Sequence, residues 1–282
     1  MKRLLTALAI FMTSTQLAFA ESYERIVTAG GDITEIVFAL GQGGKVVGVD
    51  STSIWPEQAL ELDQIGYVRG LAAEGVLSLA PDLLLGAEDS GPPNVIENLK
   101  LAGVTVETVP ATTGPERYEA KLTHIGAFLG VEEKAATLLA HHRAAMADLS
   151  ARRAKLEIAP KVLFILSVRD GAPIVGGSDT TAHDIIELAG GQNMAASFEG
   201  WKPMNSEAII TSQPDIIVMT DIHSERLGGT DAVMARPDIR ETPAGQNDAV
   251  VVMNAQLLLQ FGPRLPQAVD ALMTAFENNQ GT

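Results

Sequence analysis

The sequence predicts an α/β protein of two lobes, each with a mostly parallel sheet, joined by a long rigid α-helix. Three observations support this prediction. Short β-rich runs alternate with helical segments through most of the chain, which is typical of parallel sheets covered by helices. One block of residues occurs twice in the same order. Between the copies, residues 115–158 carry almost no β signal.

The first lobe is expected over residues 21–114. Its apolar residues Ile33, Ile36 and Leu40 recur at helical spacing, and Gly41 then ends that helix. The expected strands are 25–28, 45–49, 82–85 and 104–109, and the expected helices are 33–40, 74–79 and 95–101.

The second lobe is expected over residues 160–282, where the same pattern of strands and helices recurs. Residues 74–84 and 207–217 share a glutamate, two aliphatic residues, Pro-Asp and two more aliphatic residues in register. A helix–strand unit of this kind is common and could recur by chance. Further matches fall in the same order, however, since 36–41 is echoed by 185–190 and 104–106 by 250–252. We therefore predict two related Rossmann-like lobes.

Residues 115–159 are predicted to form a helical strut between the lobes. Pro115 suits the first turn of one helix, and Gly130 ends it. Residues 131–157 then run without glycine or proline, and a helix of about 25 residues would be roughly 37 Å long. A flexible linker would be rich in glycine and serine, so we expect the lobes to move little relative to each other.

Composition excludes several functions. The chain of 282 residues has 35 acidic and 20 basic side chains and a formal net charge of −15, which argues against binding nucleic acid through its phosphates. It has no cysteine, and this rules out disulfides, thiolate zinc sites, iron–sulfur clusters and a cysteine nucleophile.

The first twenty residues are predicted to be a secretory signal peptide. Lys2 and Arg3 precede an apolar stretch, 4–17, and small residues at −3 and −1 place cleavage after Ala20. The alternative is a membrane anchor, but polar residues interrupt the apolar stretch. An exported, acidic, cysteine-free protein fits a bacterial periplasm.

Motifs for catalysis are missing from the sequence. It contains no HExxH, no histidines at i and i+4 and no G-x-S-x-G, and residues 41–45 lack the spacing of a phosphate-binding loop. We therefore expect a protein that is not an enzyme. A periplasmic enzyme that uses the cleft and a zinc or manganese carrier remain as alternatives.

Tyr67 stands out because glycines flank a Tyr-x-Arg in residues 64–70. Such a segment between a strand and a helix can present side chains to a ligand cleft. A ferric ion and a nearby guanidinium both favour a phenolate, and in an extended segment Arg69 would lie on the same side as Tyr67. The alternative is a tyrosine packed at the edge of a lobe, with Arg69 in solvent.

Residues 66–82, GYVRGLAAEGVLSLAPD, resemble the signature of periplasmic haem-binding proteins of bacterial haem ABC importers. TPAGQN at 242–247 and LLLQFGPR at 257–264 resemble the same family. Residues 25–41 are similar to the broader class III of substrate-binding proteins, which also binds cobalamin and iron–siderophores. The resemblance covers essentially the whole mature chain.

The resemblance implies that Tyr67 ligates the iron of ferric haem b and that Arg69 supports the phenolate. Arg226 is the candidate second arginine, from the other lobe, although it could equally be a solvated loop residue. Glu74 and Glu207 match the glutamates that dock on arginines of an inner-membrane ABC permease with its ATPase. Their alternative role is to offset helix dipoles.

The same resemblance predicts a monomer. It would receive haem after an outer-membrane receptor has transported it, and would deliver the haem without a chemical reaction. Strand 162–168 lacks the histidine that holds a second haem in some relatives, so we expect one haem. Four residues could wall the pocket or belong to the cores: Trp201, Met204, Met219 and Phe261. The alternative ligand on this scaffold is a siderophore or cobalamin.

Overall fold

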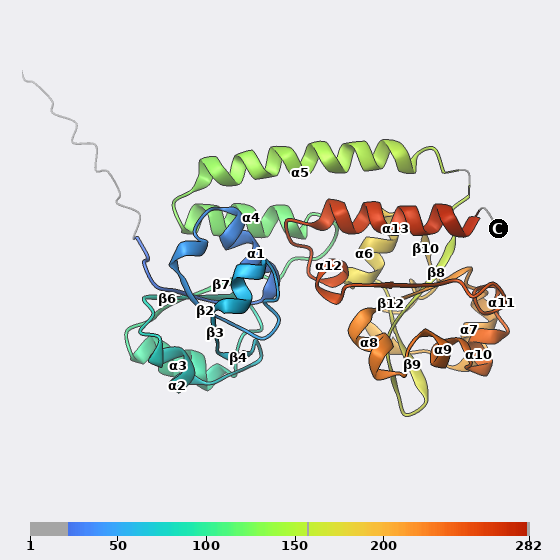
Figure 1. The fold of residues 1–282 in the computed structure, drawn as a ribbon, viewed down its shortest axis with the longest axis horizontal. Helices are drawn as coiled ribbons and strands as arrows, with labels where there is room; N and C mark the ends of the chain where they lie inside the picture. Colours follow the sequence, from blue (N-terminus) through green and yellow to red (C-terminus); the bar gives the residue numbers. More distant parts are fainter. Residues whose placement is uncertain (1–21, 157, 281–282) are drawn as a thin grey trace, which may run out of the picture.

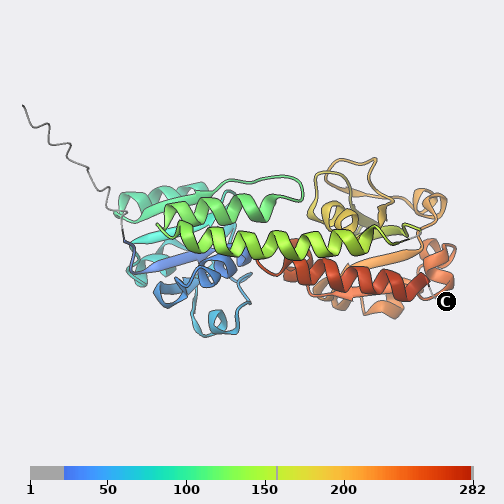
Figure 2. The ribbon, with the colours of Figure 1, turned by 90° about the horizontal axis from the view of Figure 1, so that it is seen from above.

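The computed structural model describes residues 22–156 and 158–280 of the chain. Two α/β lobes lie side by side, with one long helix running across both (Figures 1 and 2). The predicted signal peptide and its cleavage after Ala20 lie outside the described residues. Among the residues described, no helix is long and apolar enough to span a bilayer.

The first lobe is built on a five-stranded, fully parallel sheet with the strand order β3-β2-β1-β6-β7. Its central strand β1 (Ile26–Ala29) and its neighbour β6 are almost completely buried, because helices cover both faces of a parallel sheet. The other elements are β2 (Val46–Val49), β3 (Asp63–Gln64), β6 (Leu83–Ala87), β7 (Thr105–Val109), α1 (Gly31–Ala39), α2 (Ala73–Ser78), α3 (Pro93–Leu101), η1 (Gly43–Lys45) and η2 (Glu57–Glu61).

The second lobe has a mixed sheet with the order β11-β9-β8-β12-β13, and β10 also pairs with β8. Strands β8, β10, β12 and β13 run parallel, whereas β9 pairs antiparallel with both β8 and β11. Asp170 and Gly171 both have positive φ, 51° and 82°, as a tight hairpin turn requires. The strands are β8 (Lys161–Arg169), β9 (Ala172–Gly176), β10 (Gln192–Asn193), β11 (Trp201–Pro203), β12 (Ile216–Thr220) and β13 (Val250–Met253).

Helices of the second lobe surround a core that includes Phe164, Phe261 and Phe276. They are α6 (Thr181–Leu188), α7 (Ser206–Ser212), α8 (Asp221–Arg226), α9 (Thr230–Met234), α10 (Pro237–Arg240), α11 (Pro243–Gln246), α12 (Ala255–Leu259) and α13 (Leu265–Gln280). The predicted α/β fold of two lobes with mostly parallel sheets is thereby confirmed.

The internal repeat has the same geometry in both lobes. Ala80 and Gln213, each just before the Pro-Asp pair, adopt left-handed φ values of 46° and 45°. The carboxylate of Asp82 then accepts a hydrogen bond from the Arg25 amide at 3.0 Å, and that of Asp215 from the Lys161 amide at 2.8 Å. Each Pro-Asp unit therefore ties the start of its own strand to the start of the neighbouring strand.

The strut consists of α4 (Arg117–Phe128) followed by α5 (Glu132–Arg153). Helix α5 has 22 residues and is therefore about 33 Å long, somewhat shorter than expected because it ends at Arg153. It crosses both lobes, and α13 lies beside it (Figure 2). Arg152 joins the two helices through ion pairs with Asp270 and Glu277, both at 2.5 Å.

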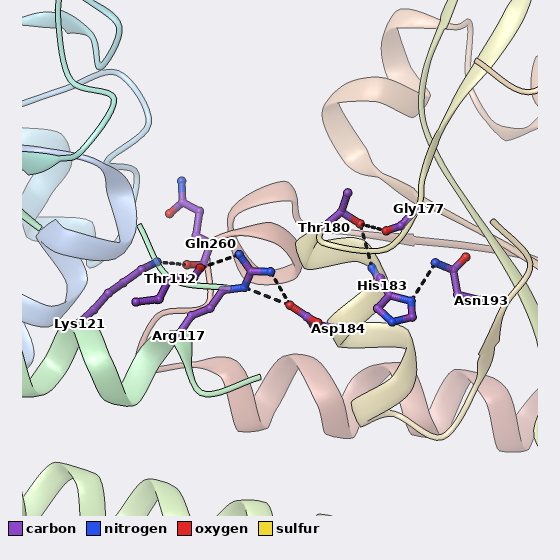
Figure 3. A network of polar contacts seen from close by, with 9 residues as sticks. All are labelled: Thr112, Arg117, Lys121, Gly177, Thr180, His183, Asp184, Asn193 and Gln260. Atoms are coloured by element: carbon purple, nitrogen blue, oxygen red, sulfur yellow. Dashed lines mark hydrogen bonds and ion pairs between the residues drawn. The ribbon is translucent and has the colours of Figure 1, made fainter. Parts of the chain in front are cut away.

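A buried polar seam also connects the lobes directly (Figure 3). Arg117 at the start of α4 pairs with Asp184 of α6 at 2.5 Å, with side chains 11% and 9% exposed. Arg264, just before α13, pairs with the buried Glu35 of α1. The two lobes are thus held by charged contacts as well as by the strut.

Candidate functional site

Tyr67 lies on a small hairpin that follows the edge strand β3. Strands β4 (Gly66–Tyr67) and β5 (Gly70–Leu71) pair so that Tyr67 faces Gly70, which leaves Val68 and Arg69 as a two-residue turn. Val68 and Leu71 are only 7% and 4% exposed, so their burial fixes the hairpin to the lobe. Tyr67 remains 45% exposed.

Arg69 contacts the ring of Tyr67 at its oxygen. Its Nη1 donates to Tyr67 Oη at 2.8 Å, and its guanidinium carbon lies 5.9 Å from the ring centroid. The expected pair is therefore brought together, but by a tight turn rather than by an extended segment. The alternative, a tyrosine at the lobe edge with Arg69 in solvent, holds in part, because the Arg69 side chain is 61% exposed while it donates to Tyr67.

Asp89 is a third member of this cluster that the sequence analysis missed. Its Oδ2 accepts from Arg69 Nε at 2.6 Å and lies 2.5 Å from Nη2. The hydrogen bond to Asp89 is the main cause that raises the pKa of Arg69 above its usual value. Asp89 follows the carboxyl end of β6, where ligand sites of parallel sheets lie, and that position could have identified it.

A cavity of about 510 Å³ lies between the lobes beside this cluster. Arg69, Asp89 and Thr112 line it from the first lobe, and Thr181 and Gln260 line it from the second. Carboxyl ends of the parallel strands β6 and β7 open into it, as expected for a binding cleft of this fold class.

Arg117 and Lys121 also line this cavity, and Figure 3 shows the contacts that they make with Thr112, Asp184 and Gln260. Lys121 of α4 donates to Asp32 at 2.5 Å and to the Gln260 carbonyl at 3.3 Å. Arg117 also donates to the Thr112 carbonyl at 2.9 Å. Arg117 and Lys121 therefore already have acceptors within the protein, as Arg69 does through Asp89 and Tyr67.

Arg226 is the last residue of α8, which Figure 1 shows on the side of the second lobe that faces the first. Its side chain is exposed and makes no hydrogen bond or ion pair within the described part of the chain. Burial, together with the charge of Arg226, lowers the pKa of His223 below its usual value. The structure does not bring Arg226 into contact with Tyr67.

Two exposed apolar side chains of the second lobe were not among the expected site residues. Ile222 of α8 is 42% exposed, and Val252 of β13 is 38% exposed. Of the four expected wall residues, Met204, Met219 and Phe261 are buried in the core, whereas Trp201 is 36% exposed.

Glu74 and Glu207 lie in the first turns of α2 and α7. Figure 1 shows α2 at the lower edge of the first lobe and α7 near the outer end of the second lobe. Both carboxylates are exposed, and neither makes a hydrogen bond or ion pair to another described residue. The N-terminus of α7 is capped instead by Asn205, whose side chain accepts from the Ala208 amide at 2.8 Å.

No group of three or more histidine, aspartate or glutamate side chains in the described ranges is arranged to hold a metal ion.

A sequence model of the family described as "Periplasmic binding protein" matches residues 26–257. The chain belongs to this family. Its members bind and carry molecules in transport and catalyse no reaction, so the expectation of a protein that is not an enzyme is confirmed.

Three known proteins resemble this chain over most of its length and indicate which kind of periplasmic binding protein it is similar to. It is 36% identical to the periplasmic heme-binding protein RhuT from Roseiflexus sp. RS-1, with a TM-score of 0.87 over 92% of this chain and 99% of that one. It is 30% identical to the vitamin B12-binding protein of Vibrio cholerae over 96% of both chains. It is 31% identical to the ABC transporter substrate-binding lipoprotein YvrC of Bacillus subtilis over 88% of this chain and 78% of that protein. These likenesses confirm the predicted resemblance to class III substrate-binding proteins.

Proposed function

We propose that this protein binds ferric haem b between its lobes, with the phenolate of Tyr67 as an axial ligand to iron. The observation that carries the proposal is the exposed phenol of Tyr67, whose oxygen accepts a hydrogen bond at 2.8 Å from Arg69, a residue that lines the interlobe cavity. The likeness to the heme-binding protein RhuT supports the same ligand.

The chemistry of this pair suits oxidised iron. Anionic oxygen is an established axial ligand of ferric haem, and a tyrosinate is one of its forms. The Arg69 donor stabilises the charged form of the phenol. Because an oxygen that accepts one hydrogen bond keeps a further lone pair, Tyr67 can hold Arg69 and iron together.

Arg226 would supply the second cation of the pocket, toward a haem propionate or the iron-bound oxygen. It is exposed and makes no ion pair among the described residues, so a carboxylate on the ligand would be its first charged partner. Ile222 and Val252 would offer apolar contact to the porphyrin face from the same lobe.

Delivery would follow by docking on an inner-membrane ABC permease that works with its ATPase. The exposed carboxylates of Glu74 and Glu207 lie one on each lobe, in the first turns of α2 and α7. Two charges on a rigid frame fix the orientation of a partner and speed its encounter more than they add affinity. The likeness to the ABC transporter lipoprotein YvrC supports this assignment.

The rest of the transport route is proposed on the same basis. The protein would act as a periplasmic monomer after cleavage at Ala20 and would receive haem that an outer-membrane receptor has admitted. Its proposed units are the lobe 21–114, the strut 115–159 and the lobe 160–282.

The test is an absorbance titration of the purified protein with hemin, cobalamin and a ferric hydroxamate siderophore side by side. We expect one equivalent of hemin to bind with the spectrum of a ferric high-spin tyrosinate, and Tyr67→Phe to weaken binding and change that spectrum. An unchanged Soret band and affinity in Tyr67→Phe would remove Tyr67 from this role.

Cobalamin is the second candidate ligand because the vitamin B12-binding protein of Vibrio cholerae matches 96% of the chain. A corrinoid carries its own cobalt ligands and does not need a phenolate. Tight cobalamin binding that tolerates Tyr67→Phe, together with weak hemin binding, would therefore favour this alternative.

A further inference from the structure

We infer that Asp89 is a positioning residue that holds the guanidinium of Arg69 so that its other edge faces the oxygen of Tyr67. This inference rests on the proposed function, since it concerns the phenolate that would bind haem iron. It adds a carboxylate that acts through Arg69 and is not itself a ligand.

The two edges of the Arg69 guanidinium have different partners. Its Nε donates to Asp89 Oδ2 at 2.6 Å, and Nη2 lies 2.5 Å from the same oxygen. Its Nη1, on the opposite edge, donates to Tyr67 Oη at 2.8 Å. Because the guanidinium is planar and its N–H donors form a fixed fork, fixing one edge fixes the direction of the other.

The backbone places Asp89 opposite the turn before any ligand arrives. The Leu71 amide donates to the Gly91 carbonyl at 2.7 Å, and the Gly91 amide donates to the Val68 carbonyl at 2.9 Å. These bonds tie the hairpin to the loop that carries Asp89. The carboxylate is therefore set by the fold, as a support for a binding group must be.

Arg69 needs such support because its side chain is 61% exposed. An exposed arginine without a fixed partner samples many rotamers, and few of them reach Tyr67. Asp89 also offsets part of the positive charge of Arg69. Arg69 consequently acts on the phenol as a directed hydrogen-bond donor, and its direction depends on Asp89.

The experiment compares Asp89→Ala and Asp89→Asn with Arg69→Ala, the double variant of Asp89→Ala with Arg69→Ala, and the matched control Glu88→Gln. Glu88 is the neighbouring acid on the same loop, and it accepts from the Ala111 amide instead of Arg69. Each variant is titrated with hemin, and the tyrosinate charge-transfer band is recorded.

We expect Asp89→Ala to weaken hemin binding by about fivefold, the upper range for an exposed ion pair, and to shift the band as Arg69→Ala does. In a protein that already carries Arg69→Ala, Asp89→Ala should cause no further loss of hemin affinity and no further shift of the band. Asp89→Asn keeps an acceptor oxygen and should restore most of the band position, and Glu88→Gln should change neither quantity.

A readout without haem separates this inference from the proposed function. The Nε–H signal of Arg69 in NMR spectra of the free protein should be protected from exchange in the native chain and in Glu88→Gln, and lost in Asp89→Ala. If hemin gives no tyrosinate band in the native protein, the proposed function fails, while this signal still tests whether Asp89 holds Arg69.

Two results would overturn the inference. One is a native tyrosinate band and affinity that Asp89→Ala leaves unchanged. The other is a loss of the same size in the presence and absence of Arg69, which would show that Asp89 merely stabilises the loop.

Discussion

Breaking the ion pair between Arg117 and Asp184 should destabilise the protein strongly. Asp184 is 9% exposed and Arg117 is 11% exposed, and two nitrogens of Arg117 reach the same carboxylate oxygen, at 3.0 Å and 2.5 Å. Removing one partner of a buried pair leaves an uncompensated charge and costs about 3–5 kcal/mol. Asp184→Leu should therefore lower the free energy of unfolding by about 3 kcal/mol.

The matched control is Arg143→Ala, which removes an ion pair with Glu119. Arg143 is 63% exposed, and an exposed ion pair contributes little to stability because water screens it. The free energy of unfolding of each variant is measured by urea denaturation, monitored by far-ultraviolet circular dichroism. Because the two lobes can unfold in separate steps, the unfolding of each lobe is also monitored by a local probe placed in that lobe. Equal, small effects of Asp184→Leu and Arg143→Ala would refute the view that this seam holds the lobes together.

Two further predictions concern docking and pH. Glu74→Ala and Glu207→Ala should leave hemin affinity unchanged but reduce haem-dependent ATPase activity of the reconstituted importer, and the double variant should reduce it further; full activity in the double variant would contradict the docking role. Burial lowers the pKa of His142, whose ring packs against that of Tyr118 with centroids 4.6 Å apart and planes tilted by 59°. Because the unfolded chain then binds the proton more readily, stability should fall as pH drops below about 6.5, and thermal melts of His142→Gln should lack this component.

Local patterns in the sequence predicted most of the fold. The spacing of apolar residues located α1, and Gly41 at φ 75° ends it as expected. The Pro-Asp repeat in the sequence indicated two related lobes. In the structure, each copy makes the same contact between neighbouring strands. These features depend on residues that lie close together in the chain.

The parts that were not predicted depend on contacts between distant segments. Glu35 and Arg264 pair across 229 positions of the chain, and no periodicity shows which charges will meet. The antiparallel ribbon of β9 and β11 was missed because its strands are short and partly exposed. Arg69 was found from its spacing to Tyr67, whereas Asp89, which pairs with it, comes from the turn after β6.

A crystal structure of the hemin-loaded protein, with iron located by its anomalous scattering, tests the central claim most directly. We expect the iron atom between the lobes, bonded to the oxygen of Tyr67, with Arg69 still donating to that oxygen. Iron bonded to another side chain, or a Tyr67 ring turned away from the porphyrin, would contradict the account.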